Sequence, residues 1–140
     1  MRVLALDVGE RRIGVALSDP LGLTAQRLTV VDRRGTVQDI EQIRTLVTRH
    51  HVETIVVGHP LTMRGEQGIQ AQRVAAFAQR LRDQLSMTVQ LVDERLTTVQ
   101  GERSLRETQT SARNRKRVID QVAAQLILQH FLDAKRPTTP

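Results

Sequence analysis

This 140-residue chain contains no cysteine, no tryptophan and no tyrosine, and its only aromatic residues are Phe77 and Phe131. Without cysteine it can form neither a disulfide nor a thiolate metal site, and it has no thiol nucleophile. The scarcity of aromatic rings also disfavours a binding mode that stacks unpaired bases on aromatic side chains. Aliphatic side chains and alanine must therefore fill the core.

Long apolar runs are absent as well. No stretch approaches the roughly 20 apolar residues that span a bilayer, and the short apolar run before Asp7 is too short for a signal peptide. We therefore expect a cytoplasmic protein with no membrane partner. The length of 140 residues predicts a single domain over residues 1–140, in which residues 136–140 form a frayed tail.

Positive charge is in excess, with 21 Lys and Arg against 15 Asp and Glu and a formal net charge of +6. Residues 95–117 contain seven basic and two acidic residues, so this segment alone carries +5. Such a segment favours a polyanionic partner, most commonly nucleic acid, although a solvated basic surface has the same composition. The candidate nucleic-acid-binding residues are Arg11, Arg12, Arg113, Arg115, Lys116 and Arg117. For Arg11 and Arg12 the alternative is a plain solvent-exposed turn.

The spacing of apolar residues predicts alternating strands and helices. Strands are expected at residues 2–8, 13–17, 23–31, 54–58 and 89–92, with a tight hairpin through residues 9–12 and an edge position for 23–31. Helices are expected after a Thr36/Asp39 capping box, over 74–85, over 97–108, and over 117–134 after a polar loop at 108–116. The order β-β-β-α-β-α-β-α-α predicts a mixed α/β fold, a five-stranded sheet with helices on its faces.

Three acidic residues stand where apolar residues are expected. Asp7 ends the first buried strand, Glu94 follows Asp93 at the end of another, and Asp120 lies on the apolar stripe of the last helix. A buried carboxylate costs several kcal/mol unless a cation or hydrogen bonds compensate it. Because adjacent strand residues face opposite ways, only one of Asp93 and Glu94 can point toward the same place as Asp7 and Asp120. The two-residue alternation of a strand does not decide which one does.

Each acid also has a simpler interpretation. Asp7 would cap the turn at Gly9, Glu94 would pair with Arg95 or another arginine, and Asp120 would be favoured by the dipole at a helix N-terminus. Taken together, hard oxygen ligands from three separate elements favour Mg²⁺ or Mn²⁺. Two such ions about 4 Å apart can activate water and stabilise the leaving oxygen of a phosphodiester.

Four segments resemble, in order, the signature motifs of the YqgF (RuvX-type) family: Asp7–Asp19 (DVGERRIGVALSD), Val57–Leu61 (VGHPL), Asp93–Thr98 (DERLTT) and Ile119–Ala124 (IDQVAA). The resemblance extends from residue 2 to about residue 133. It implies an RNase H-like fold and metal-dependent hydrolysis of phosphodiesters. It also implies a catalytic and metal-binding triad of Asp7, Glu94 and Asp120, which selects Glu94 over Asp93.

For the reaction, the resemblance implies maturation of the 5′ end of pre-16S ribosomal RNA, with Holliday junction resolution in DNA as the alternative. We expect in-line attack by water that leaves a 5′-phosphate and a 3′-hydroxyl, with two ions sharing Asp7. A monomer is favoured over a homodimer. His59 departs from the aliphatic residue expected there, and it is either a phosphate contact or proton shuttle, or incidental.

Two further classes of protein share parts of this pattern. An Asp-x-Gly hairpin also opens actin-like and sugar-kinase phosphotransferases, but those enclose ATP between two such domains and 140 residues supply one. The other rival is a non-catalytic nucleic-acid-binding factor of ribosome assembly. Three intact carboxylates argue against it, because a pure binder gains nothing from acids beside phosphates.

Overall fold

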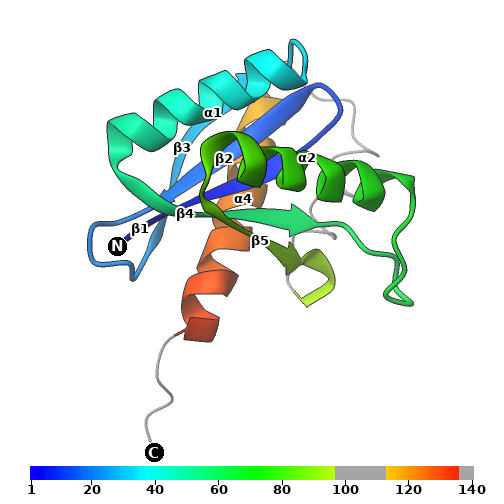
Figure 1. Ribbon diagram of the computed structural model, residues 1–140. Coiled ribbons are helices and arrows are strands. Elements are labelled where there is room, and N and C mark those ends of the chain that lie inside the picture. Colours follow the sequence, from blue (N-terminus) through cyan, green and yellow to red (C-terminus); the bar gives the residue numbers. More distant parts are fainter. Residues whose placement is uncertain (97–112, 136–140) are drawn as a thin grey trace, which may run out of the picture.

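The computed structural model describes the backbone of residues 1–96 and 113–135, with the side chains of residues 1–95 and 117–135 (Figure 1). One five-stranded sheet runs through it, in the order β3-β2-β1-β4-β5. Its strands are β1 (Arg2–Val8), β2 (Arg12–Ser18), β3 (Ala25–Asp32), β4 (Val52–His59) and β5 (Thr88–Asp93). β1, β2 and β3 pair antiparallel, whereas β1, β4 and β5 pair parallel. The predicted mixed sheet and the edge position of its third strand are confirmed.

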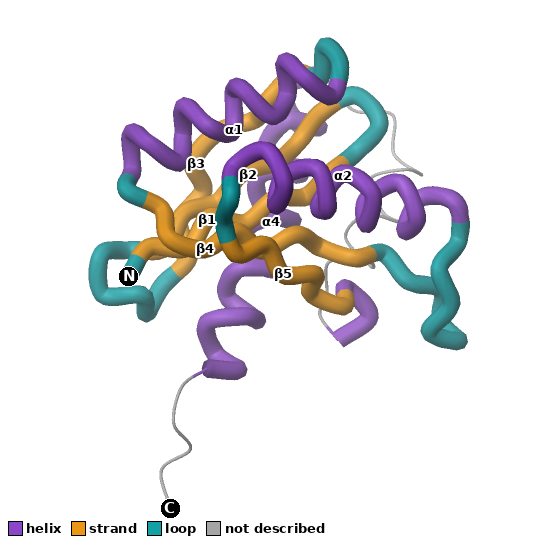
Figure 2. The backbone as a smooth tube through the Cα atoms, viewed as in Figure 1, coloured by secondary structure: helices purple, strands orange, loops and turns teal. Residues whose placement is uncertain are grey.

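Helices cover both faces of the sheet, as Figure 2 shows. α1 (Thr36–His50) and α2 (Ile69–Leu85) lie on one face, α4 (Arg113–Lys135) crosses the other, and a short 3₁₀ turn, η1 (Glu94–Leu96), follows β5. None of the helices within the described ranges is long and apolar enough to cross a membrane. The helix predicted over 97–108 and the tail at 136–140 lie outside the described residues.

Alternation along β1 divides the core into two clusters. Leu4, Leu6 and Val8 pack under α1 and α2, whereas Val3 and Ala5 pack under α4. Each fully buried aliphatic side chain stabilises the fold by roughly 1.5–3 kcal/mol relative to its exposed state. The α4 side of the core also contains Ala16, Ala123 and Ala124, all buried. Small side chains on both surfaces let this helix approach the sheet closely.

The last helix begins earlier than the sequence predicts. Residues 113–116 belong to α4, so the loop expected over 108–116 is wrong for these four positions. Polar composition indicated a loop, but arginine and lysine have high helix propensity and nothing in Arg-Asn-Arg-Lys breaks a helix. Asp120 therefore lies beyond the first turn of α4, and the interpretation of this residue as an N-terminal helix charge is also wrong.

The capping box predicted between Thr36 and Asp39 at the start of α1 is wrong. The N-cap is Gly35, which makes no side-chain cap, and its φ of 141° favours glycine. Asp39 instead accepts hydrogen bonds from Arg34 N at 2.9 Å and from Arg33 Nε at 3.0 Å. A buried carboxylate thus ties the chain before the helix to its first turns.

Candidate active site

The register of β1 and β2 places Asp7 on the face that α4 covers. Asp7 lies directly opposite Gly14 in the antiparallel pair, so its side chain leaves the sheet on the same face as a Cβ at Gly14 would. A Cβ built on Gly14 would collide with the backbone of Asp120. The backbone of Asp120 therefore packs directly on the sheet beside the strand position that carries Asp7.

Glu94 reaches the same face from the other side of β1. Gly58 of β4 pairs with Val92, and a Cβ on Gly58 would collide with a carboxylate oxygen of Glu94 and lie 2.5 Å from Ile127 Cδ1 of α4. The Glu94 carboxylate thus lies over β4, beneath α4, in space that only a glycine leaves open. Asp7, Glu94 and Asp120 come from β1, η1 and α4 and share one face of the sheet.

Asp93 has a different environment. Its carboxylate accepts a hydrogen bond from Arg95 N at 2.9 Å and pairs with Arg95 Nη2 at 2.7 Å. The side-chain hydrogen bond from Arg95 is the largest cause of the lowered pKa of Asp93. Arg95 therefore pairs with Asp93 and not with Glu94, so pairing of Glu94 with Arg95 is wrong, whereas its pairing with another arginine stays a prediction.

The three carboxylates are deeply buried, with 3% of Asp7, 1% of Glu94 and 8% of Asp120 exposed to solvent. Burying ionised carboxylates close to each other carries a desolvation cost and mutual repulsion, which a cation offsets. The equally buried Asp39 illustrates that rule, because Arg33 supplies its cation at 3.0 Å. Three buried carboxylates on one face of the sheet therefore make this a place that favours positive charge.

Arg12 supplies a cation to one of the three acids. Its Nε donates to Asp120 Oδ2 at 2.8 Å, and the two side chains are 21% and 12% exposed. Arg117, one turn before Asp120, pairs with Asp32 of β3 at 2.6 Å. Since Asp32 is also the strand partner of Arg12, two ion pairs fasten the first part of α4 to β2 and β3.

The basic residues predicted to bind nucleic acid therefore differ in exposure and in ion pairing. Arg11 is exposed in the β1–β2 turn, whereas Arg12 and Arg117 are held in the ion pairs with acids of this chain. The side chains of Arg113, Arg115 and Lys116 lie outside those described. Among the side chains that the structure describes, Arg12 is the member of this set that contacts one of the predicted catalytic acids, Asp120.

The donor set suits Mg²⁺ or Mn²⁺, because it consists of buried carboxylate oxygens on one face. In the described parts of the chain, however, no three His, Asp or Glu side chains form a group that could hold a metal ion as they stand. The Arg12–Asp120 pair gives a physical reason, since it directs one carboxylate toward a guanidinium. The residues fit a divalent cation in their chemistry, and binding one would require Asp120 to exchange this partner.

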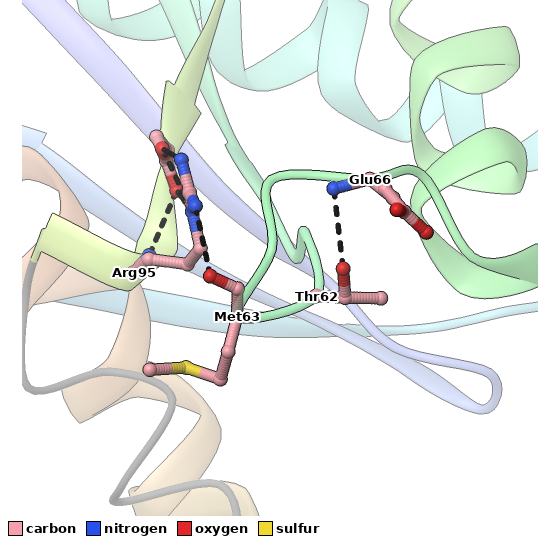
Figure 3. A network of polar contacts seen from close by, with 5 residues as sticks. Thr62, Met63, Glu66 and Arg95 are labelled. Atoms are coloured by element: carbon pink, nitrogen blue, oxygen red, sulfur yellow. Dashed lines mark hydrogen bonds and ion pairs between the residues drawn. The ribbon is translucent and has the colours of Figure 1, made fainter.

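The loop between β4 and α2 is fastened to the end of β5 beside Glu94. Arg95 Nη1 donates to the carbonyl oxygen of Met63 at 3.3 Å, and Thr62 Oγ1 accepts from Glu66 N at 3.1 Å (Figure 3). The ring of His59 lies 3.1 Å from Gln67 Oε1. His59 thus contacts the loop that follows β4.

Two residues important to the geometry, Gly14 and Gly58, were not singled out by sequence reasoning. Both lie inside strands, where glycine weakens the strand and marks a place that another group approaches closely. That signal was present in the sequence, but it does not say which group approaches.

Comparison with known proteins places the chain in a family. The family model described as "RuvX: Holliday junction resolvase" matches residues 1–134. The chain belongs to the RuvX family. This confirms the resemblance to the YqgF (RuvX-type) family inferred from the four motifs.

Curated relatives agree over nearly the full length. A protein of Moorella thermoacetica named "Putative pre-16S rRNA nuclease" is 52% identical over 133 residues, which cover 95% of each chain. Proteins of the same name from Clostridium novyi and Clostridium botulinum are 45% and 42% identical over 134 residues, covering 96% of this chain and 99% and 98% of theirs.

Solved structures confirm the fold. The structure titled "T. thermophilus RuvC in complex with Holliday junction substrate" superposes with a TM-score of 0.59 and 16% identity, covering 96% of this chain and 95% of that one. A second RuvC structure from Thermus thermophilus gives a TM-score of 0.53 at 15% identity. The predicted RNase H-like fold is therefore confirmed.

Proposed function

We propose that this RuvX-family protein is a metal-dependent nuclease that hydrolyses phosphodiester bonds and matures the 5′ end of pre-16S ribosomal RNA in the cytoplasm. The observation that carries the proposal is the placement of Asp7, Glu94 and Asp120, buried and from three elements, on one face of the sheet. The names of the Moorella and Clostridium relatives support nuclease chemistry and this RNA. Family membership favours it over the phosphotransferase interpretation.

In this proposal Asp7, Glu94 and Asp120 would hold one or two Mg²⁺ or Mn²⁺ ions. Such ions, when bound, would activate water and stabilise the leaving oxygen. Departure of the 3′ oxygen would give products with a 5′-phosphate and a 3′-hydroxyl. Burial strengthens the attraction between each carboxylate and a cation, because the surroundings screen charge less than water does. Close packing of α4 through its alanines fixes the carboxylate of Asp120 relative to the sheet.

Several basic residues are proposed to hold the substrate backbone. Arg11 is exposed in the turn between β1 and β2, and Arg113, Arg115, Lys116 and Arg117 precede Asp120 in the chain. Arg12 would join them once a cation takes its place at Asp120, leaving its guanidinium free to bind a phosphate. We propose that the protein acts on RNA as a monomer.

The second candidate is resolution of Holliday junctions in branched DNA. The description of the family model favours it, and the RuvC fold is compatible with it. A resolvase that cuts two strands symmetrically acts as a dimer, so this candidate also predicts a homodimer.

The decisive experiment is a cleavage assay with Mg²⁺, Mn²⁺ or EDTA that compares the wild type with Asp7→Asn. Its substrates are a pre-16S RNA fragment that includes the 5′ cleavage site, single-stranded DNA and a four-way DNA junction. Asp83→Asn is a matched control, because Asp83 lies on α2 and contacts Gln79 there. Cleavage that needs metal, is lost in Asp7→Asn and is kept in Asp83→Asn supports the nuclease, and the preferred substrate identifies the reaction.

Equal cleavage by Asp7→Asn and the wild type would contradict the proposed site. Binding without cleavage of any substrate would instead favour the non-catalytic assembly factor. That alternative predicts that Asp7→Asn still rescues ribosome assembly in cells that lack the protein.

A further inference from the structure

A second concave surface lies on the face of the sheet opposite α4. It is a groove of about 520 Å³ between the β1–β2 turn, the start of α1 and one side of α2. We call it the α1–α2 groove, and its principal lining residues are Gly9, Glu10, Arg33, Arg73, Phe77 and Arg80. None of these residues is part of the carboxylate site or of the predicted basic set.

The groove has a net positive lining, because Arg33, Arg73 and Arg80 outnumber the single acid, Glu10. Arg73 and Arg80 are seven residues apart on α2 and therefore lie on one side of the helix, with Phe77 between them. Both arginines are exposed, and the contact of Arg73 with Glu10 is long, at 4.0 Å. Their guanidinium groups are thus available to an anion.

The floor of the groove is rigid and partly apolar. Arg33 is fixed by Asp39 at 3.0 Å and by the carbonyl oxygen of Gly9 at 2.9 Å, and its guanidinium lies 5.2 Å from the centre of the Phe77 ring. An oriented arginine over an aromatic ring, beside two exposed arginines, suits a ligand that carries phosphates on an organic framework.

The groove and the carboxylate site meet at the end of β1. Asp7 faces α4, whereas the next residue, Val8, lines the groove together with the turn that follows. The two surfaces therefore begin at neighbouring residues on opposite faces of the same strand end. A nucleic acid chain that crosses this end of the sheet can reach both surfaces.

We propose that the α1–α2 groove binds a phosphodiester segment of the substrate outside the bond that is cleaved, with Arg73 and Arg80 contacting its phosphates. This inference rests on the proposed nuclease function and extends it to a second, distal subsite. It predicts that long substrates bind through both surfaces, whereas oligonucleotides of a few residues bind without the groove.

The test is a binding titration in EDTA, so that cleavage plays no part. Fluorescent single-stranded RNAs of 6 and 20 nucleotides are titrated with wild type, with Arg73→Gln/Arg80→Gln and with the control Arg27→Gln/Arg49→Gln at several salt concentrations. The control removes the same charge from exposed positions on β3 and at the end of α1. Glutamine keeps helix propensity close to that of arginine, and circular dichroism checks folding.

For the 20-nucleotide RNA, we expect the groove variant to bind several-fold more weakly. The slope of log affinity against log salt should fall by about 1.4, the value for two lost phosphate contacts to a single strand. The 6-nucleotide RNA and the control variant should change little. Glu10→Gln, which removes the only acid among the principal lining residues, should act in the opposite direction and tighten binding of the longer RNA.

Three results would overturn the inference. One is an unchanged slope in the groove variant, and another is an equal loss in the control, which would mean that only net charge matters. The third is saturable binding of AMP to the wild type that requires Arg73 and Arg80 while RNA binding does not, which would assign the groove to a free nucleotide. Failure of the nuclease proposal is distinguishable, because it would appear as the absence of metal-dependent cleavage by the wild type, whereas the groove is tested by binding in EDTA.

Discussion

Arg12 Nε donates a hydrogen bond to Asp120 Oδ2 at 2.8 Å and so joins the second strand to the last helix within the proposed metal site. The guanidinium occupies the electrostatic role that a divalent cation would have at this carboxylate. An arginine cannot be deprotonated in a protein, so only movement of its side chain can release Asp120. The Arg12–Asp120 pair is therefore expected to compete with metal binding.

Arg12→Gln should lower the thermal stability of the metal-free protein and increase its stabilisation by Mn²⁺. Loss of the pair leaves Asp120 buried without this cation, which costs about 1–3 kcal/mol for a partly buried pair. The same change removes the competitor, so Mn²⁺ should bind more tightly. The measurement is the melting temperature in EDTA and over a Mn²⁺ titration, together with calorimetric binding of Mn²⁺.

Arg117→Gln is the matched control, because it breaks the comparable pair with Asp32 at 2.6 Å without touching a proposed ligand. It should lower stability in EDTA and leave the Mn²⁺ response as in the wild type. If Mn²⁺ stabilises both variants equally, Arg12 does not compete with the metal for Asp120.

Glu94→Gln should reduce cleavage by about 10²-fold or more, whereas Asp93→Asn should leave most of the activity. Glu94 lies beneath α4 on the same face of the sheet as Asp7 and Asp120, whereas the carboxylate of Asp93 forms an ion pair with Arg95. The neutral amide has the shape of the acid and removes one negative charge, so calorimetry should also show weaker Mn²⁺ binding for Glu94→Gln alone. The reverse ranking of the two variants would assign the site to Asp93.

The Asp93–Arg95 pair predicts a dependence of stability on pH. Arg95 lowers the pKa of Asp93 below its ordinary value of 3.8, so in acid the unfolded chain binds this proton more readily than the folded protein does. The contribution of the pair is complete above the ordinary pKa and is lost as pH falls through the folded value. Asp93→Asn should therefore be less stable than wild type near pH 7, by about 1 kcal/mol.

Urea titrations of the two proteins at pH 7 and at successively lower pH measure this difference. The gap between them should shrink as the pH falls below the ordinary pKa of Asp93. A gap that stays constant over this range would show that Asp93 contributes through hydrogen bonds or packing that do not depend on its charge.

The sheet and most helices could be predicted because their signals are local. The apolar runs of β1 and β4 and the helical spacing of α1 and α2 lie within single segments. All four elements are present, although α2 begins at Ile69, before the predicted start at residue 74. The start of α4 could not be predicted, because residues 113–116 are polar and helical at once. Polarity indicates exposure, and an exposed segment can be a loop or a helix.

The candidate site was predictable in its acids but not in its pairings. A carboxylate at the end of an apolar strand indicates that a cation or hydrogen bonds offset its burial cost. The group that does so comes from elsewhere in the fold. Arg12 and Asp120 are 108 residues apart, and no sequence period relates them. The choice between Asp93 and Glu94 likewise depends on where the chain turns after β5, which Arg95 and the backbone of η1 determine.

The last prediction concerns the two glycines that let α4 and Glu94 approach the sheet. Gly14→Ala places a Cβ against the backbone of Asp120, and Gly58→Ala places one against the Glu94 carboxylate and Ile127. Backbone cannot move aside as a flexible side chain can, so Gly14→Ala should shift α4 and cost about 1–3 kcal/mol. Gly58→Ala should displace Glu94 and weaken Mn²⁺ binding together with cleavage.

Gly68→Ala is the control for both, because a Cβ there meets only Thr62 Cγ2 at an ordinary 3.9 Å and its φ of −75° suits alanine. Urea unfolding, calorimetric Mn²⁺ binding and cleavage rates should all stay near wild type in this variant. Wild-type stability and Mn²⁺ binding in Gly14→Ala would mean that α4 does not need this close approach. The placement of Asp120 beside Asp7 would then lose its main structural support.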